Sequence, residues 1–319
     1  MTDRGKRAGT TWIHAWERYW FTDIPPHSYA LLRVALGIVG LLGLAGLTPL
    51  SMYWPADSLA PSVGGGLGLR AYAVALGLGT DVGYALYATL LLSFFCITAG
   101  VFTTLTMPLA FIATALQGLW NPLPLSASHK AFVALLFCLM WADCGGALTF
   151  RSWSSAARHT GHPTRAIWPL RLMRAQIAIV YLGSGIAKFF GPSWRDGSAV
   201  HYALTQNAFH RFPAPLPPSM EWLLTLATYF TLTWELAFIV LVFNRRTRAS
   251  ALWLGVALHL GMGVAMELGT FSLVMITSYV AFVEPRTVER VVTRISGRFR
   301  SRSIGGPEDP RLSAIADVN

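Results

Sequence analysis

Charged residues are scarce in this sequence, where they make up 13% of 319 residues, against 54% for hydrophobic residues. An ordinary soluble domain carries about 25% charged residues. The mean hydropathy of +0.48 points the same way. The composition therefore excludes an ordinary soluble chain and predicts a protein that crosses a membrane several times.

Cysteine is also scarce, and the three residues, Cys96, Cys138 and Cys144, lie within or beside apolar runs. Their number is odd and their spacing fits neither a metal site nor a disulfide framework, so we expect packing thiols and no metal. The sequence also lacks a Walker loop, a dinucleotide-binding glycine motif, a Ser-His-Asp motif and a His-Glu-x-x-His motif. These absences disfavour phosphate and nucleotide chemistry.

Negative charge is the scarcer sign, since 15 Asp and Glu oppose 25 Lys and Arg, which gives a formal net charge of +10. Cations clustered on one polar face would indicate nucleic acid, but these cations lie in short stretches between apolar runs. We therefore expect the lipid bilayer, and no nucleic acid, as a partner.

Long apolar runs are plentiful, and a helix needs about 17–25 residues to cross a bilayer. We expect an all-α, polytopic helical bundle with eight transmembrane helices, at about residues 28–47, 82–100, 102–119, 129–145, 167–190, 221–243, 249–266 and 270–285. Together they form a transmembrane domain over residues 28–285. Residues 286–319 are expected to form a basic, disordered tail.

The N-terminal segment, residues 1–27, is expected to hold a cytoplasmic tail and a helix that lies in the membrane interface. Its aromatic and apolar side chains recur at helical spacing: Trp12, Ile13, Trp16, Tyr19 and Trp20. A second short helix of this kind is expected at about residues 67–79. No small-residue cleavage site follows Met1, so the first span is expected to direct insertion.

Lysine and arginine gather in cytoplasmic loops. With eight spans both termini share one side, and that side collects most of the cations: Arg4, Lys6, Arg7, Arg151, Arg158, Arg165, Arg171, Arg245, Arg246, Arg248 and the arginines of the tail. We expect this side, with both termini, to be cytoplasmic.

The apolar stretch from Arg174 to Lys188 carries a cation at each end and stops at a Gly-Pro break. An ionisable group at membrane depth must lose its water, so it usually faces a protein interior or a wet cavity and marks a functional site. A buried lysine becomes neutral readily and can then act as a base. A lysine near an apolar rim can also extend its ammonium group to the interface, which is the structural alternative. We favour a base at Lys188.

Other ionisable residues of the expected spans must be paired or line a cavity. Asp143 and Arg174 are expected to form a buried ion pair that ties helices together, with Arg33 and Glu235 in similar structural roles. These four are expected near the middle or the inner half of the bundle.

Three further polar residues are candidates for a site with Lys188. His129 and Lys130 open the fourth span on the outer side, where the fifth span ends, so they are expected to approach Lys188. His259 lies at mid-span and is a catalytic candidate, although neighbouring carbonyl or hydroxyl groups would also satisfy a buried imidazole.

The segment Arg174-Ala-Gln-Ile-Ala-Ile-Val-Tyr-Leu-Gly-Ser-Gly-Ile-Ala-Lys188, followed by Trp194 and Gly197, resembles the vitamin K-dependent gamma-glutamyl carboxylase and its bacterial relatives. Those relatives form the horizontally transferred transmembrane (HTTM) domain family. The similarity extends to the segments that begin at His129 and His259, and covers most of residues 15–285.

The resemblance implies a lyase-like reaction in a bacterial plasma membrane. In that family a lysine deprotonates reduced vitamin K, whose reaction with oxygen gives a base strong enough to remove a carbon-bound proton before carbon dioxide adds. Lys188 matches this lysine, and His129 matches a histidine that would orient the quinol oxygen. His259 is the third catalytic candidate. The implied cofactor is vitamin K hydroquinone or menaquinol, with the following residues expected to bind it: Tyr181, Trp194 and Lys130.

Three functions remain open from the sequence. The first is an enzyme that uses a quinol and oxygen on an unknown substrate, such as a peptide or protein. The second is a non-enzymatic protein that binds lipid or peptide, with a role in peptide maturation, export or immunity. The third is a transporter, which is disfavoured because paired interrupted helices in two similar halves are absent. The carboxylase continues into a large substrate-docking domain, and the sequence leaves open whether a partner subunit takes its place here.

Overall fold

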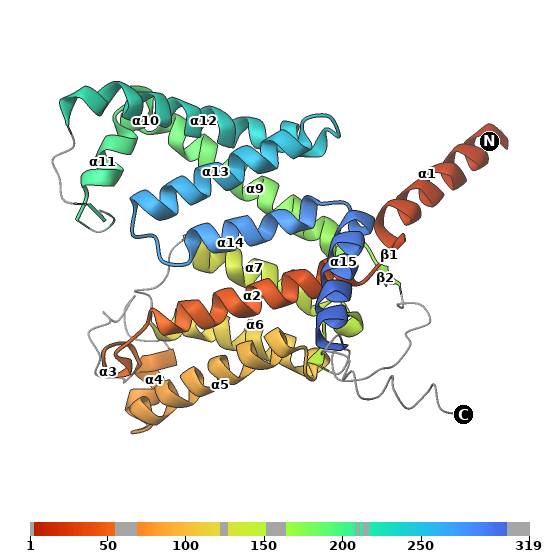
Figure 1. The fold of residues 1–319 in the computed structure, drawn as a ribbon, viewed down its shortest axis with the longest axis horizontal. Coiled ribbons are helices and arrows are strands. Elements are labelled where there is room, and N and C mark those ends of the chain that lie inside the picture. The colour runs from red at the N-terminus through yellow and green to blue at the C-terminus, as the bar shows by residue number, and fades with distance from the viewer. Residues whose placement is uncertain are drawn as a thin grey trace, which may run out of the picture.

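The structure is a computed structural model that describes residues 3–54, 69–121, 127–150, 164–207, 209, 211–212 and 217–304. Within these ranges the longer helices run alongside one another as a bundle (Figure 1): α2 (His27–Ala45), α5 (Gly79–Ala99), α6 (Thr103–Trp120), α7 (Ala127–Met140), α9 (Trp168–Phe190), α12 (Glu221–Phe243), α13 (Arg248–Ala265) and α14 (Phe271–Ser278). The all-α prediction is confirmed.

Short elements connect or extend these helices: α3 (Leu50–Tyr53), α4 (Leu69–Ala75), α10 (Pro192–Arg195), α11 (Ala199–Thr205) and the 3-10 helices η1 (Cys144–Gly146), η2 (Pro218–Met220) and η3 (Tyr279–Phe282). The described strands are β1 (Asp23–Ile24) and β2 (Arg165–Ala166), which pair antiparallel with Asp23 opposite Ala166. This pair ties the segment before α2 to the segment before α9.

Four described helices are long and apolar enough to cross a membrane: His27–Ala45, Gly79–Ala99, Pro218–Phe243 and Arg248–Ala265. Two shorter apolar helices cover Ser128–Met140 and Phe271–Phe282. All eight predicted segments contain a helix, but the number of eight spans is not confirmed. Three arginine or lysine residues make α9 more polar, and α7 ends at Met140, five residues before the predicted end of its span.

Helix α2 lies at the centre of the core, where Tyr29, Leu32 and Leu36 are fully buried. Its neighbours are α5, α14 and α15, and the layer of α5 and α6 covers one side of it. On the other side of the bundle, α9 packs against both α12 and α7. It therefore joins α12 and α13 to α7 and α6, since α13 packs on α12 and α6 packs on α7. This position puts the polar face of α9 among several helices.

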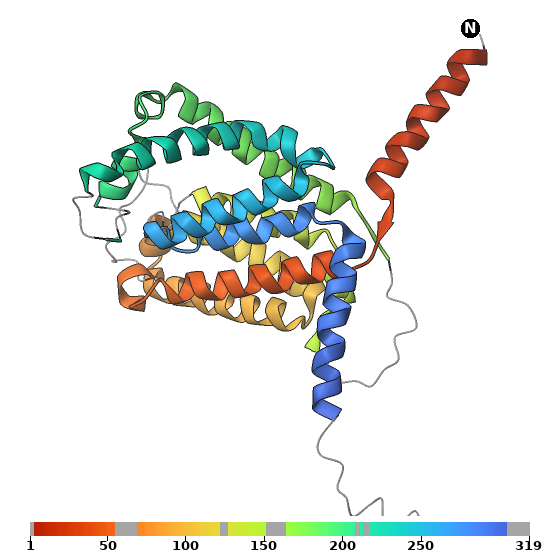
Figure 2. The ribbon, with the colours of Figure 1, turned by 45° about the horizontal axis from the view of Figure 1, so that its top comes forward.

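Two amphipathic helices extend from one end of the bundle (Figures 1 and 2): α1 (Asp3–Phe21) and α15 (Pro285–Ile304). In α1 the side chains of Trp12, Trp16 and Tyr19 are exposed, and the guanidinium carbon of Arg171 lies 3.6 Å from the centre of the Tyr19 ring. The exposed aromatic face is the feature from which the sequence predicts an interfacial helix.

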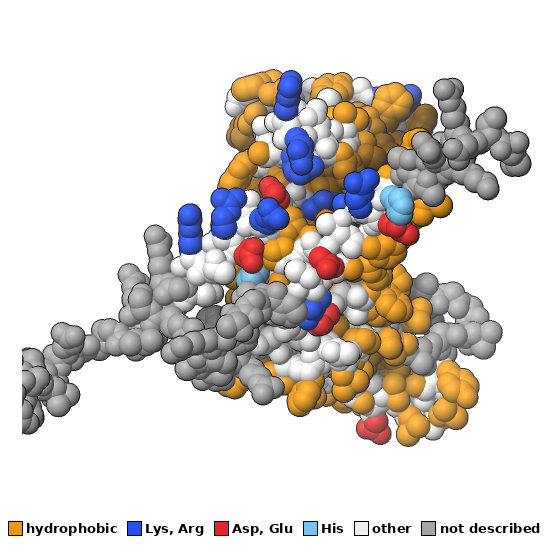
Figure 3. Space-filling view, turned by 90° about the vertical axis from the view of Figure 1, so that its right-hand side faces the viewer, with side chains coloured by type: hydrophobic (Ala, Val, Ile, Leu, Met, Phe, Trp, Pro, Cys, Tyr) orange, Lys and Arg blue, Asp and Glu red, His pale blue; other side chains and the backbone are white. Residues whose placement is uncertain are grey.

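Helix α15 begins where the sequence predicts the disordered tail. Residues 285–304 are helical, because Val288 and Val292 recur at a four-residue spacing and are buried, and α15 packs against α2. Residues 305–319 lie outside the described residues. Figure 3 looks at this end of the bundle, where lysine and arginine side chains gather.

Candidate functional site

Helix α9 carries the candidate site on one face. Arg174, Tyr181, Ser184 and Lys188 are separated by three, four or seven residues, so they lie along one side of the helix. This side meets α12, α13 and η3, because Tyr181 and Lys188 form hydrogen bonds with side chains of these elements. The face is therefore an interior polar stripe rather than a lipid-facing one.

Lys188 is held by a carboxylate. Its Nζ atom donates to both carboxylate oxygens of Glu235, each at 2.7 Å, and to Ser184 Oγ at 2.6 Å. The two side chains of the ion pair are 22% and 11% exposed. Three charge-assisted hydrogen bonds orient the ammonium group towards α12. The sequence predicted a structural role for Glu235 nearer the middle of the bundle, and its contact with Lys188 was missed.

Trp194 closes one side of Lys188. The chain turns after α9, with Gly191 N donating to Lys188 O at 2.8 Å, and α10 brings the indole ring to 5.1 Å from Nζ. The ammonium group of Lys188 and the ring of Trp194 are close enough for a cation–π attraction.

The turn continues to Asp196. Hydrogen bonds from the hydroxyl and the backbone N–H of Ser198 hold the pKa of Asp196 below its usual value.

A second cluster lies two helical turns before Lys188. The hydroxyl of Tyr181 is 2.6 Å from Nε2 of His259 and 2.6 Å from the hydroxyl of Tyr279. All three residues are buried, at 2–4% exposure. Tyr181 can donate to the imidazole while it accepts from Tyr279. It can also accept from the imidazole N–H while it donates to Tyr279, so the row of three groups has two hydrogen-bond arrangements of opposite direction.

His259 keeps one ring nitrogen without a partner. Its Nδ1 atom is buried and forms no hydrogen bond among the described residues. The predicted structural alternative, in which neighbours satisfy both nitrogens, therefore holds only for Nε2. Tyr279 is the residue that sequence reasoning missed in this cluster, and its only signal was a tyrosine near the end of an apolar segment.

The two clusters meet on α12. Trp234 packs edge-on against Tyr181, with ring centres 4.9 Å apart, and Glu235 is the next residue. Phe238, one turn further, lies 4.3 Å from the Tyr181 ring. Apolar aromatic walls thus enclose the polar row of Tyr181, and the same helix supplies the carboxylate for Lys188.

His129 and Lys130 lie in the first turn of α7, with His129 half-buried and Lys130 exposed. Figure 1 places the start of α7 and the end of α9 at the same end of the bundle. Among the described residues, however, no hydrogen bond or ion pair joins either residue to Lys188. The structure brings Lys188, Trp194, Tyr181 and His259 into adjoining clusters, and leaves these two apart from them.

The predicted ion pair between Asp143 and Arg174 is wrong. Asp143 pairs with Arg165 at 2.6 Å, because α7 ends at Met140 and the chain turns towards β2. Arg174 donates from Nε to the carbonyl oxygen of Ala281 at 2.6 Å. The two residues therefore bind different neighbours.

In the part of the chain that the structure describes, no acidic side chain forms an ion pair with Arg33, contrary to the expectation that the acidic and basic groups of the inner half would pair. Its fully buried guanidinium group donates to five backbone carbonyl oxygens, those of Ile97, Thr98, Cys144, Ala147 and Leu148. The last carbonyl groups of a helix have no partner four residues on, and Arg33 donates to two of them at the end of α5, of which that of Ile97 also accepts from Gly100 N. Its role is to join α2, α5 and η1.

Among the described residues, no group of three or more His, Cys, Asp or Glu side chains is placed to hold a metal ion. The polar groups of the two clusters are amine, carboxylate, phenol, imidazole and indole. These groups accept, donate and hold protons, and aromatic rings surround them. The arrangement suits proton transfer to or from an apolar molecule that bears a hydroxyl or carbonyl group.

The model of the HTTM domain family matches residues 68–286, which is more than half of the chain and includes Lys188, Glu235, His259 and Tyr279. No curated protein and no solved structure matches.

Proposed function

The chain belongs to the HTTM domain family, and from this premise we propose that it is a membrane enzyme that uses a reduced quinone and oxygen in a carboxylase-like reaction. The observation that carries the proposal is the partly buried, hydrogen-bonded pair of Lys188 and Glu235 beside the ring of Trp194. A binding protein with an inert interior gains little from a buried ion pair, which costs desolvation energy.

The pair, rather than the lysine alone, acts as the base in this proposal. With Lys188 as an ammonium ion, Glu235 is the group that can take up one proton and become a carboxylic acid. The proton can reach Glu235 directly, or Lys188 can pass its own proton to Glu235 and be reprotonated at Nζ. Either route changes the charge of the pair from zero to plus one, and Ser184 Oγ stays bonded to Nζ.

The residues around the pair fit a quinol. When bound, a reduced quinone supplies an oxidisable hydroxyl group and an apolar tail. Trp194 offers a ring surface beside Lys188, and the buried Nδ1 atom of His259 is a polar group without a partner. In our proposal Tyr181 and Tyr279 fix the imidazole through Nε2, and His259 Nδ1 would hold a hydroxyl group of the quinol.

His129 and Lys130 keep a secondary place in the proposal. Their position at the start of α7 suits a role at the entrance of the site, where a half-buried imidazole and an exposed ammonium group attract the polar head of an amphipathic molecule. A peptide or protein substrate, or a partner subunit, would approach from this end.

Quinol oxidation by the purified full chain in lipid nanodiscs tests the proposal. We expect oxygen-dependent oxidation of menaquinol or vitamin K hydroquinone, and a loss of about 100-fold or more in Lys188→Ala and in Glu235→Gln. Arg246→Ala is the control, because Arg246 is exposed on the α12–α13 connection. Equal rates in the wild type and Lys188→Ala would remove this lysine from the chemistry.

The second candidate function is non-enzymatic binding of a lipid or a peptide in maturation, export or immunity. The closed contacts favour it, because Lys188 already has three hydrogen bonds within the protein. Mass spectrometry of the molecules that copurify with the wild type separates the two candidates. A quinone supports the enzyme, and phospholipid or peptide alone, with no quinol oxidation, supports the binding protein.

A further inference from the structure

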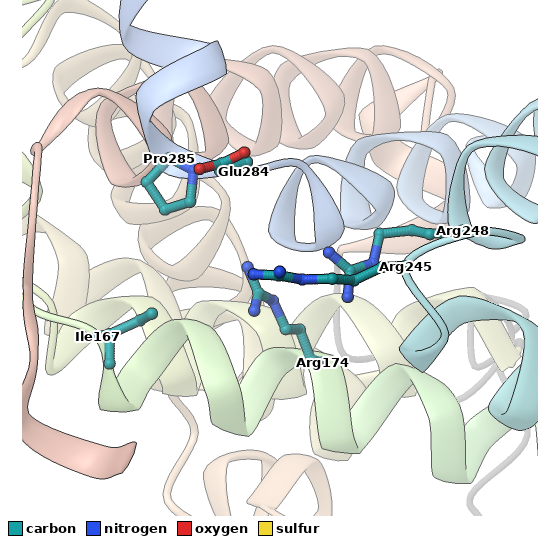
Figure 4. Close-up of a pocket in the computed structure, with 6 residues that line it drawn as sticks. All are labelled: Ile167, Arg174, Arg245, Arg248, Glu284 and Pro285. Atoms are coloured by element: carbon teal, nitrogen blue, oxygen red, sulfur yellow. The ribbon is translucent and has the colours of Figure 1, made fainter. Parts of the chain in front are cut away.

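A cavity of about 610 Å³ lies near the start of α9, at the opposite end of this helix from Lys188. It is lined by Ile167, Arg174, Arg245, Arg248, Glu284 and Pro285, which lie at or near the start of α9, in the α12–α13 connection, at the start of α13 and at the start of α15 (Figure 4). Along α9, Arg174 and Lys188 are about 21 Å apart at a rise of about 1.5 Å per residue. The cavity is therefore separate from the candidate site.

Three guanidinium groups converge in this cavity. Figure 4 shows those of Arg174, Arg245 and Arg248 turned towards the same space, with Glu284 on the far side. Among the described residues, no carboxylate lies within 4.0 Å of a nitrogen of these arginines. Three positive charges and one negative charge line the space, so two positive charges have no counter-charge there.

Backbone carbonyl groups hold two of the arginines in place. Nε of Arg174 donates to Ala281 O at 2.6 Å, and Nε of Arg248 donates to Val242 O at 2.9 Å. Both side chains are half-buried. Because carbonyl groups are neutral, these bonds fix the direction of the guanidinium groups and leave the charge unbalanced. The terminal nitrogens of Arg174 form no hydrogen bond among the described residues and stay available to a ligand.

Membrane topology does not explain this arrangement. Arginines that only mark the cytoplasmic side of a membrane can lie apart in the solvent, where their repulsion is weak. Half-buried arginines that face one another repel more strongly, because the surroundings screen their charges less. An arrangement of this kind is stable when an anion binds between the cations.

We propose that this cavity binds a phosphate group. A guanidinium group donates two parallel hydrogen bonds to phosphate oxygens, and three such groups match a tetrahedral anion with several acceptors. The net charge of the lining, plus two, is balanced in full by a phosphate monoester with two negative charges, and half of it is balanced by a phosphodiester with one.

The position of the cavity favours an anionic phospholipid as the source of that phosphate. It lies at the end of the apolar bundle from which α1 extends, and α1 presents exposed tryptophans. Side chains of this kind settle at the level of lipid headgroups, which is the level at which a phosphodiester would enter. A soluble phosphate ester offers the same chemistry from the aqueous side.

Lipid binding to the purified full chain tests this inference, measured by native mass spectrometry with added phosphatidylglycerol or phosphatidylcholine. A parallel titration with glycerol 3-phosphate, followed by calorimetry, tests the soluble source. Arg245→Ala is the informative variant, because Arg245 lines the cavity, is exposed, and its side chain forms no hydrogen bond with the residues that the structure describes. Arg246→Ala is the matched control, one residue away and outside the lining.

We expect the wild type to retain phosphatidylglycerol more strongly than phosphatidylcholine. Arg245→Ala should weaken this binding about tenfold, with Arg246→Ala within about twofold of the wild type. Arg174→Gln should have a loss similar to that of Arg245→Ala. Binding of glycerol 3-phosphate with the same dependence on Arg245, and no preference for the anionic lipid, would support the site with a soluble ligand.

The inference is overturned by two results. One is the absence of selective binding of any of these probes to the wild type, and the other is equal loss in Arg245→Ala and Arg246→Ala. Neither result depends on quinol oxidation, so the failure of one proposal leaves the other standing.

Discussion

Lys188 and Glu235 stand on different helices, α9 and α12, and the Nζ atom of the lysine is 2.7 Å from each oxygen of the carboxylate. Each charge is the counter-charge of the other in a region where water is limited. Removal of one partner leaves an unpaired charge, whereas removal of both leaves two polar or apolar side chains. Substitutions of the two residues therefore test the contribution of the pair to the packing of α9 against α12, as well as its role in chemistry.

We expect Lys188→Met and Glu235→Gln each to lower the free energy of unfolding by about 2 kcal/mol, below the value for a fully buried pair because the two side chains are partly exposed. The double variant should lose less than the sum of the two. Thermal unfolding of the four proteins in one detergent measures this. Additive losses would contradict a direct interaction between the two side chains.

The hydroxyl of Tyr181 forms hydrogen bonds with two side chains of this cluster, whereas that of Tyr279 forms a hydrogen bond with one. Tyr181→Phe should destabilise the protein by about 1–3 kcal/mol, because Tyr279 and Nε2 of His259 both lose their partner in a buried place. Tyr279→Phe should cost less, since the bond between Tyr181 and His259 remains.

Tyr84→Phe is the control for this series, because Tyr84 is exposed on α5. Thermal unfolding gives the order of the three variants. An equal effect of Tyr181→Phe and Tyr84→Phe would mean that the row of hydrogen bonds contributes nothing to stability.

Close packing of α13 against η3 depends on Gly255. A Cβ atom at this position would overlap the Tyr279 hydroxyl and would lie 2.8 Å from a ring carbon of Trp234. Gly255→Ala should therefore displace Tyr279 and cost about 1–3 kcal/mol. Gly261→Ala, on the same helix with nothing within 4 Å, should be neutral or stabilising by up to about 1 kcal/mol. Unfolding temperatures that fall equally in both variants would contradict this account.

The positions of the helices could be predicted from the sequence, because long apolar runs mark the segments that are removed from water. α2, α5 and α12 begin and end within three residues of the predicted spans. The end of α7 could not be predicted this way. Residues 141–145 are apolar enough to continue a helix, but Asp143 accepts a hydrogen bond from Gly145 N and pairs with Arg165, and the chain turns there.

The sequence showed which polar residues belong to the candidate site, but it did not show which side chains they contact. The sequence identified Lys188, Tyr181 and His259, since a polar group in an apolar helix is costly to bury and usually marks a functional site. Which side chains meet depends on which helices are neighbours and on their rotation, and hydropathy contains neither. For this reason the contact of Glu235 with Lys188 was missed, and the carbonyl groups around Arg33 had no signal in the sequence.

The contact between Arg33 and Gly100 provides the last prediction. Gly100 ends α5 with φ at +72°, and a Cβ atom there would lie 2.7 Å from Nη1 of Arg33. Gly100→Ala combines an unfavourable backbone angle with an overlap on a fixed guanidinium group, so we expect a loss of about 2–4 kcal/mol. Gly77 has the same φ of +72° and nothing within 4 Å of its Cβ position, so Gly77→Ala should show the backbone cost alone, about 1 kcal/mol. The same Cβ position lies 2.9 Å from Cα of Thr149, so the difference between the two variants in thermal unfolding measures the overlap with Arg33 and Thr149 together. A difference near zero would mean that both neighbours move freely, which is incompatible with a guanidinium group held by five carbonyl oxygens.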